Sequence, residues 1–198
     1  MILNHLWGLY SNPRTEWQQI DRNHENYWYA LSHILIIALI PSVCSYYASA
    51  QIGWSIGAGD TIRLTHESAL FMSLGMYFGL VVGVSSLAMM IHELAEVFDA
   101  KPSITQALEL AAYTATPLYM VGFACLYPEL WFISAVGLVG LAYSIYLLYS
   151  GVPILMHIPE EKGFIYASTV VTCGLVLLSV LMAMSVILLN SGSGITYL

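Results

Sequence analysis

The chain has 198 residues, of which 59% are hydrophobic and only 9% are charged. Soluble globular domains carry about 25% charged residues, so this composition predicts a membrane protein, and the length fits one compact all-α domain. The formal net charge is −7, with five Lys and Arg residues in total. Binding to a nucleic-acid backbone needs a basic patch, so the charge balance argues against nucleic acid as a partner.

The three cysteines, Cys44, Cys125 and Cys173, fall inside apolar windows and show no paired spacing. This pattern predicts neither a disulfide framework nor a zinc site, and we expect no cofactor. The first 16 residues lack the basic start, the long apolar run and the small-residue cleavage site of a signal peptide. We therefore expect the chain to insert through its first transmembrane helix.

Residues 1–28 form a mixed segment before the first apolar run. Asn12 followed by Pro13 is typical of a helix start, because proline is favoured at the first helical position. Charged residues then alternate with Trp17 and Ile20. This pattern predicts a short amphipathic helix lying in the cytoplasmic interface of the membrane. An ordinary lead-in to the first span is the alternative.

Five long apolar segments follow, and each clears the roughly 18–20 residues needed to cross about 30 Å of hydrocarbon. They predict a polytopic all-α protein with a five-helix transmembrane domain over 29–190 and a short tail over 191–198. The predicted spans are 31–50, 69–92, 108–126, 130–150 and 166–189. Pro41 lies near the middle of the first span and is expected to kink it.

The distribution of Lys and Arg predicts the orientation of these spans. Five spans place the two termini on opposite sides of the membrane. With the N-terminus inside, the inner segments hold four cations and the outer segments hold only Arg63. The inner cations are Arg14, Arg22, Lys101 and Lys162. The positive-inside rule then predicts a cytoplasmic N-terminus and a C-terminus on the outer side of the membrane.

The second span contains Gly75, Gly79 and Gly83 at a spacing of four residues. Residues four apart share one face of a helix, so these glycines form a groove that another backbone can approach closely. Small residues at this spacing mark close helix contacts in membranes. The repeat predicts helix packing, either within the fold or between copies.

The third span is interrupted by a stretch of small residues, hydroxyls, a tyrosine and a proline. This stretch is Ala112, Tyr113, Thr114, Ala115, Thr116 and Pro117. Lipid does not solvate a freed backbone group, so neighbouring helices must compensate for the proline. We interpret Ala112, Tyr113, Ala115 and Pro117 as a helix-packing centre. Tyr113, Thr114 and Thr116 could instead line a polar path for a solute.

An acidic cluster at the end of the second span is the only candidate metal site. His92, Glu93 and Glu96 resemble part of the zinc-protease helix HExxH but lack the second histidine, so no metal is predicted. Acidic residues at a helix carboxyl end are disfavoured by the dipole. Lys101, Lys162, a metal ion or a partner could offset them. In the metal case, His92 and Glu96 could share an ion with Glu109 or His33.

No ionisable residue is expected deep in any span, since His33, His92 and Glu109 are placed near cytoplasmic ends. Transporters and pumps usually keep a charged or strongly polar group near mid-bilayer, so its absence disfavours transport. The sequence also contains no Ser-His-Asp set, P-loop or CxxC. We therefore predict that the protein is not an enzyme.

The order and spacing of these features resemble the Yip family, the Ypt/Rab-interacting integral membrane proteins. The family hallmark is a Gly-Tyr-x-x-x-Pro element, and here Ala112 stands where that glycine is usual, before Tyr113 and Pro117. The run Tyr149-Ser150-Gly151-Val152-Pro153 is similar to the family's Tyr-x-Gly element at the end of the fourth span. The resemblance covers nearly the whole chain.

Eukaryotic members of this family act in vesicle traffic and contact Rab GTPases and one another. They have a long cytoplasmic N-terminal domain that this sequence does not show. Its N-terminal segment, with Asn12-Pro13 and Trp17, is similar to that of a small bacterial member. The resemblance therefore implies a bacterial inner membrane and does not transfer the trafficking role. It supplies no catalytic residues.

Together these features predict a non-enzymatic membrane-organising or scaffold protein. Its expected partners are the lipid bilayer and either a second copy or another membrane protein. A small channel or transporter for an ion or small solute is the alternative, and a membrane metalloenzyme using His92, Glu93 and Glu96 is a third, weaker one.

Overall fold

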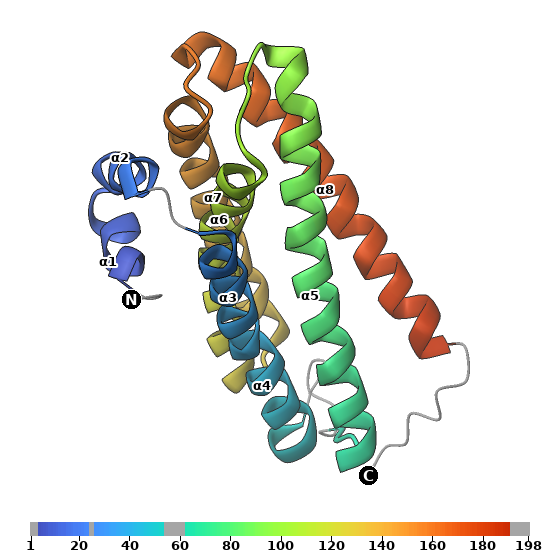
Figure 1. Ribbon diagram of the computed structural model, residues 1–198. Helices are drawn as coiled ribbons and strands as arrows, with labels where there is room; N and C mark the ends of the chain where they lie inside the picture. The colour runs from blue at the N-terminus through green and yellow to red at the C-terminus, as the bar shows by residue number, and fades with distance from the viewer. Residues whose placement is uncertain (1–3, 24–25, 54–61, 191–198) are drawn as a thin grey trace.

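The computed structural model describes residues 4–23, 26–53 and 62–190, and every regular element within these ranges is a helix (Figure 1). The elements are α1 (Asn4–Ser11), α2 (Pro13–Asn23), α3 (Tyr27–Ile37), α4 (Leu39–Tyr47), η1 (Ala48–Ile52), α5 (His66–Ala95), η2 (Glu96–Phe98), α6 (Ile104–Met120), η3 (Val121–Leu126), α7 (Leu130–Leu155) and α8 (Glu160–Asn190). The expected tail, 191–198, lies outside the described residues.

The long helices run alternately down and up one bundle (Figure 1). Within the described residues, the chain makes five such passes. These passes are α3 to η1, α5 with η2, α6 with η3, α7 and α8. The connections from α5 to α6 and from α7 to α8 both lie at the upper end of the bundle in Figure 1.

The first pass is broken at Ala38, between α3 and α4. Proline has no amide hydrogen, and its ring crowds the carbonyl four residues earlier. For Pro41 that carbonyl belongs to Ile37, which is the last residue of α3. The helix is therefore interrupted one turn before the proline.

The start of α6 is fixed by a capping box over residues 103–106. The Ser103 hydroxyl oxygen accepts from the Gln106 amide N–H at 3.2 Å, and the Ser103 amide N–H donates to Oε1 of Gln106 at 2.8 Å. Each contact satisfies an amide that the first helical turn leaves without a partner. The turn before it contains Asp99 in the left-handed region, with a φ of 58°.

Helix α6 is the interior helix of the bundle. It packs against α3, α5 and α7, and the side chains of Glu109, Tyr113, Thr114 and Thr116 are at most 5% exposed. Four other segments are long and apolar enough to cross a membrane: Tyr27–Ile52, His66–Phe98, Leu130–Leu155 and Glu160–Met184. The helix over 104–126, which contains the predicted span 108–126, is not among these four segments.

The N-terminal segment forms a helical hairpin beside the bundle, and α2 begins at Pro13 as expected (Figure 1). Trp17 and Ile20 on α2 are fully buried in the main core, and α2 contacts α7. The hydroxyl of Tyr143 on α7 donates to the Leu9 carbonyl oxygen at 2.8 Å. The apolar face of the amphipathic helix therefore covers protein, where the sequence suggested lipid.

Candidate functional site

The middle of α6 is built for close packing, and a glycine on α7 makes this possible. A Cβ added to Gly140 would lie 2.4 Å from Cγ2 of Val121 and 3.4 Å from the Pro117 carbonyl oxygen. The two helices therefore approach more closely than a larger residue allows. Ala112 and Pro117 are both buried here, whereas Ala115 is only partly buried.

Tyr113 joins three parts of the chain inside the bundle. Its ring packs edge-on to Trp17 of α2, with centroids 6.2 Å apart, and against His33 of α3, with centroids 4.7 Å apart. Both partners are at most 1% exposed. Aromatic pairs at these distances are favourable beyond the area that they bury. Tyr113 therefore fixes the N-terminal hairpin and the first pass relative to α6.

A hydrogen bond crosses between α3 and α6 beside this ring. Nε2 of His33 lies 3.0 Å from Oγ1 of Thr116, whose hydroxyl donates to the Ala112 carbonyl oxygen at 3.0 Å. A hydroxyl has a single proton, so both contacts form together only when Thr116 accepts from a proton on Nε2 of His33. The Thr114 hydroxyl is likewise directed at backbone, donating to the Leu110 carbonyl oxygen at 2.6 Å.

Two ionisable side chains are more deeply enclosed than the sequence suggested. His33 and Glu109 were placed near the cytoplasmic ends of spans, and each is only 1% exposed inside the bundle. Glu109, Tyr113 and Thr116 share one face of α6, since they are spaced four and three residues apart. This spacing is visible in the sequence, and it is the signal that could have indicated a polar helix face directed into the bundle.

The residues of the expected polar path separate onto different sides of α6. Thr114 and Ala115 line a cavity of about 160 Å³ between α5, α6, α7 and α8, whose other lining residues are mostly aliphatic. Tyr113 and Thr116 face α3 through the His33 contacts. The cavity therefore suits hydrocarbon better than a hydrated solute.

The three glycines of α5 have different surroundings. A Cβ on Gly83 would lie 2.8 Å from Cδ1 of Leu181, so this glycine accommodates α8. A Cβ on Gly75 or Gly79 would meet nothing within 4 Å. The large side chains beside them are exposed: Phe71 by 56%, Phe78 by 61% and Val82 by 57%. We call the surface formed by Phe71, Gly75, Phe78, Gly79 and Val82 the open face of α5.

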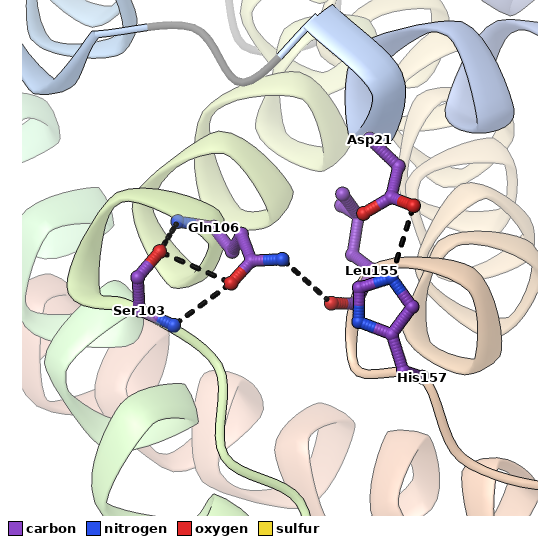
Figure 2. Close-up of polar contacts among 5 residues, drawn as sticks. All are labelled: Asp21, Ser103, Gln106, Leu155 and His157. Atoms are coloured by element: carbon purple, nitrogen blue, oxygen red, sulfur yellow. Dashed lines mark hydrogen bonds and ion pairs between the residues drawn. The ribbon is translucent and has the colours of Figure 1, made fainter.

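Polar contacts tie the helix ends together at the upper end of the bundle, as Figure 2 shows. Nε2 of His157 lies 3.0 Å from Oδ2 of Asp21, and Nε2 of Gln106 donates to the Leu155 carbonyl oxygen at 3.3 Å. His157 has a φ of 52°, which turns the chain out of α7. The end of α7 is therefore held by both α2 and α6.

The acidic segment at the end of α5 and η2 forms an ion pair with α8. Nζ of Lys162 donates to Oδ2 of Asp99 at 2.6 Å, and this contact holds the pKa of the Asp99 carboxyl below its usual range. His92 is partly buried, while Glu93 and Glu96 are exposed. Within the described ranges, no three His, Cys, Asp or Glu side chains converge as a metal site would require.

Known proteins match this chain over nearly its whole length, including all five passes. The sequence profile of the Yip1 domain matches residues 7–181, which run from α1 into α8. This chain belongs to the Yip1 domain family. The chain is 35% identical, over 191 residues, to the inner membrane protein YohC of Escherichia coli K12. YohC of an E. coli O6:H1 strain matches equally well.

Both alignments cover 96% of this Yip1-family chain and 98% of the relative. No solved structure matches. The family resemblance stated from the α6 stretch and the end of the fourth span is thus confirmed by matches over nearly the whole chain.

The packing roles of two glycines escaped the sequence analysis of this Yip1-family chain. A Cβ on Gly151 would lie 2.7 Å from Cε2 of Trp17, so this glycine makes room for the buried indole. A Cβ on Gly122 would lie 2.4 Å from Cα of Pro41, so η3 and α4 meet backbone to backbone. Gly151 appeared only within a family element, and nothing local marked Gly122.

Proposed function

We propose that this chain is a non-enzymatic protein of the bacterial inner membrane that organises the membrane by helix association, first of all with a second copy of itself. The inner-membrane location is supported by its similarity to YohC over nearly its full length. The family and these relatives are named as a domain and as inner membrane proteins, without an enzymatic activity. The observation that carries association is the open face of α5.

The proposal includes five membrane spans: the four long apolar segments and, in addition, the helix over 104–126. The 17 residues of α6 and the 6 of η3 reach roughly 37 Å, enough to cross the hydrocarbon. Its polar residues are compatible with a span because other helices enclose them. With the positive-inside rule, five spans give a cytoplasmic N-terminus and a periplasmic C-terminus. The test is a reporter enzyme that works only in the cytoplasm, fused after Leu198. Activity of this fusion would contradict the proposed orientation.

The open face of α5 has the features of a close helix–helix contact. Gly75 and Gly79 leave space on one face, and the exposed side chains of Phe71, Phe78 and Val82 form a ridge beside it. Association in a bilayer depends on packing, since apolar side chains are as soluble in lipid as in protein. A second α5 offers the same ridges and the same groove, so a symmetric pair is self-complementary.

The test uses two glycines that have the same empty surroundings on different helices. Gly79→Leu fills the groove of α5, and Gly137→Leu adds the same bulk to an open position on α7. Crosslinking in native membranes should lose the dimer with Gly79→Leu and retain it with Gly137→Leu. An unchanged dimer in the Gly79 variant would remove the role of this face. A crosslinked product of different mass would indicate another membrane protein as partner.

A small channel or transporter using Tyr113, Thr114 and Thr116 is the alternative proposal. It would require solute or ion flux in proteoliposomes that Thr116→Val suppresses. The burial of all three side chains and the backbone-directed hydroxyls of the two threonines favour the packing role.

A further inference from the structure

A second pocket lies where α2 crosses the ends of α7 and α8. It has a volume of about 270 Å³ and receives Arg14 and Gln18 from α2. Tyr149 and Pro153 of α7, with Glu160 and Phe164 of α8, complete the lining used here. The pocket therefore combines a cation, an anion, hydrogen-bonding groups and an aromatic ring.

The two charges in this pocket are available to a ligand. Nη2 of Arg14 lies 3.5 Å from Oε1 of Glu160, and these side chains are 73% and 80% exposed. An exposed ion pair contributes little to stability, so exchanging each partner for a ligand group costs little. A ligand with both a negative and a positive group could therefore replace the pair with two contacts of its own.

The position of the pocket points to a lipid. The apolar segment of α7 ends at Leu155 and that of α8 begins at Glu160, so the pocket lies at the level where a bilayer has its headgroups. Phe164 and Ile165 are 63% and 60% exposed on the first turns of α8. Their apolar surface continues from the pocket toward the hydrocarbon and suits an acyl chain.

We propose that this pocket binds the zwitterionic headgroup of a phospholipid of the phosphatidylethanolamine type. The guanidinium of Arg14 contacts the phosphate, because Arg recognises phosphate oxygens well. The carboxylate of Glu160 contacts the ammonium, and the nearby Phe164 ring adds a favourable aromatic face for a cation. An anionic headgroup fits less well, because the carboxylate of Glu160 would repel it.

Native mass spectrometry of the purified full chain tests this site, after reconstitution with equal amounts of phosphatidylethanolamine and phosphatidylglycerol. The wild type should retain phosphatidylethanolamine in preference. Arg14→Gln should reduce this retention about tenfold, as expected for loss of one charge-assisted contact. Glu160→Gln should shift the preference toward phosphatidylglycerol, because a lone cation remains.

Matched controls lie on the same two helices. Arg22→Gln on α2 and Glu161→Gln on α8 change the same charges on exposed residues outside the pocket lining, and both should bind like the wild type. Equal retention by Arg14→Gln and Arg22→Gln, or an unchanged lipid preference in Glu160→Gln, would overturn the proposal. Melting temperatures of all four variants establish that each is folded.

A second arm distinguishes a lipid from a soluble zwitterion. Phosphoethanolamine without acyl chains should bind at least about tenfold more weakly, because it cannot use the apolar surface of Phe164 and Ile165. Equal binding would overturn the assignment to lipid. The same spectra report monomer and dimer separately, so this site can fail or succeed independently of association through α5.

Discussion

Nε2 of His33 lies 3.0 Å from Oγ1 of Thr116, a contact between residues 83 positions apart. It joins the first pass to the interior helix α6, directly beside the buried Tyr113 ring. Both residues are 1% exposed, so water cannot replace the hydrogen bond if one partner is removed. The packing of α3 against α6 therefore includes one specific buried polar contact.

Removal of this hydroxyl should destabilise the protein measurably. Thr116→Val keeps the shape of the side chain but leaves the buried His33 N–H without this acceptor, at a cost of about 1–2 kcal/mol in the free energy of unfolding. Thr114→Val is the matched control, because the Thr114 hydroxyl donates to carbonyl oxygens of its own helix, those of Leu110 and Ala111. Denaturant unfolding in mild detergent should show a clearly smaller loss for the control. Equal losses would show that the contact to His33 adds nothing.

The approach of η3 to α4 predicts a strong effect from a single methyl group. Gly122→Ala places a Cβ 2.4 Å from Cα of Pro41, and backbone atoms cannot move aside as a flexible side chain can. We expect a loss of about 1–3 kcal/mol in unfolding free energy, as for other overpacked sites. Gly137→Ala, with nothing within 4 Å, should change stability by less than about 1 kcal/mol. A similar stability for both variants would contradict the close approach.

The contact of Trp17 with Gly151 holds the N-terminal hairpin against α7. Nε1 of Trp17 donates to Oγ of Ser150 at 3.1 Å, and a Cβ on Gly151 would lie 2.7 Å from the indole. Gly151→Ala should therefore loosen the hairpin and speed proteolytic cleavage within α1 and α2. Gly174→Ala, whose Cβ would make only an ordinary 3.6 Å contact with Leu87, should be cleaved like the wild type. Cleavage at one rate in all three proteins would count against this role for Gly151.

The ion pair between Asp99 and Lys162 predicts a dependence on pH and salt. The pKa of Asp99 is lowered in the folded protein, first by the hydrogen bond from Lys162 and then by its charge. A lowered pKa means that the stabilisation is present above the carboxyl's ordinary pKa and is lost as the pH falls through the folded value. The wild type should thus be slightly more stable than Asp99→Asn at pH 7.

This stability difference should disappear in acid and shrink at high ionic strength, because the pair is exposed and screened. Unfolding curves of both proteins at several pH and salt values measure it. A difference that persists after the carboxyl is protonated would show that the ion pair is not its source.

The local features of the chain were readable from its sequence. Pro41 indicated a break in the first pass, and Pro13 indicated the start of α2. The spacing of Ser103 and Gln106 is likewise a local signal of a capping box at the start of α6. Each depends on residues within one helical turn, where backbone hydrogen bonding decides the outcome. Four of the five predicted spans were also found as long apolar helices, and the fifth segment is helical.

The relations between distant elements were not readable in the same way. Trp17 reaches Gly151 and Tyr113, so the apolar face of α2 is covered by protein, and no local pattern distinguishes this from lipid. His33 and Glu109 are enclosed because α6 is the interior helix, which depends on how all five passes pack. Gly83 and Gly79 look equivalent in the sequence, yet only Gly83 has a neighbouring helix.

The most direct test of association through α5 is disulfide crosslinking in native membranes. Cysteine is introduced at position 79 in a chain whose own Cys44, Cys125 and Cys173 are replaced by alanine, and Gly137→Cys serves as control. A symmetric α5 pair brings the two Cβ atoms at position 79 near the distance of about 4 Å that a disulfide requires. The account predicts an oxidised dimer with Gly79→Cys and a monomer with Gly137→Cys. A monomer with Gly79→Cys, or equal dimer in both variants, would contradict it.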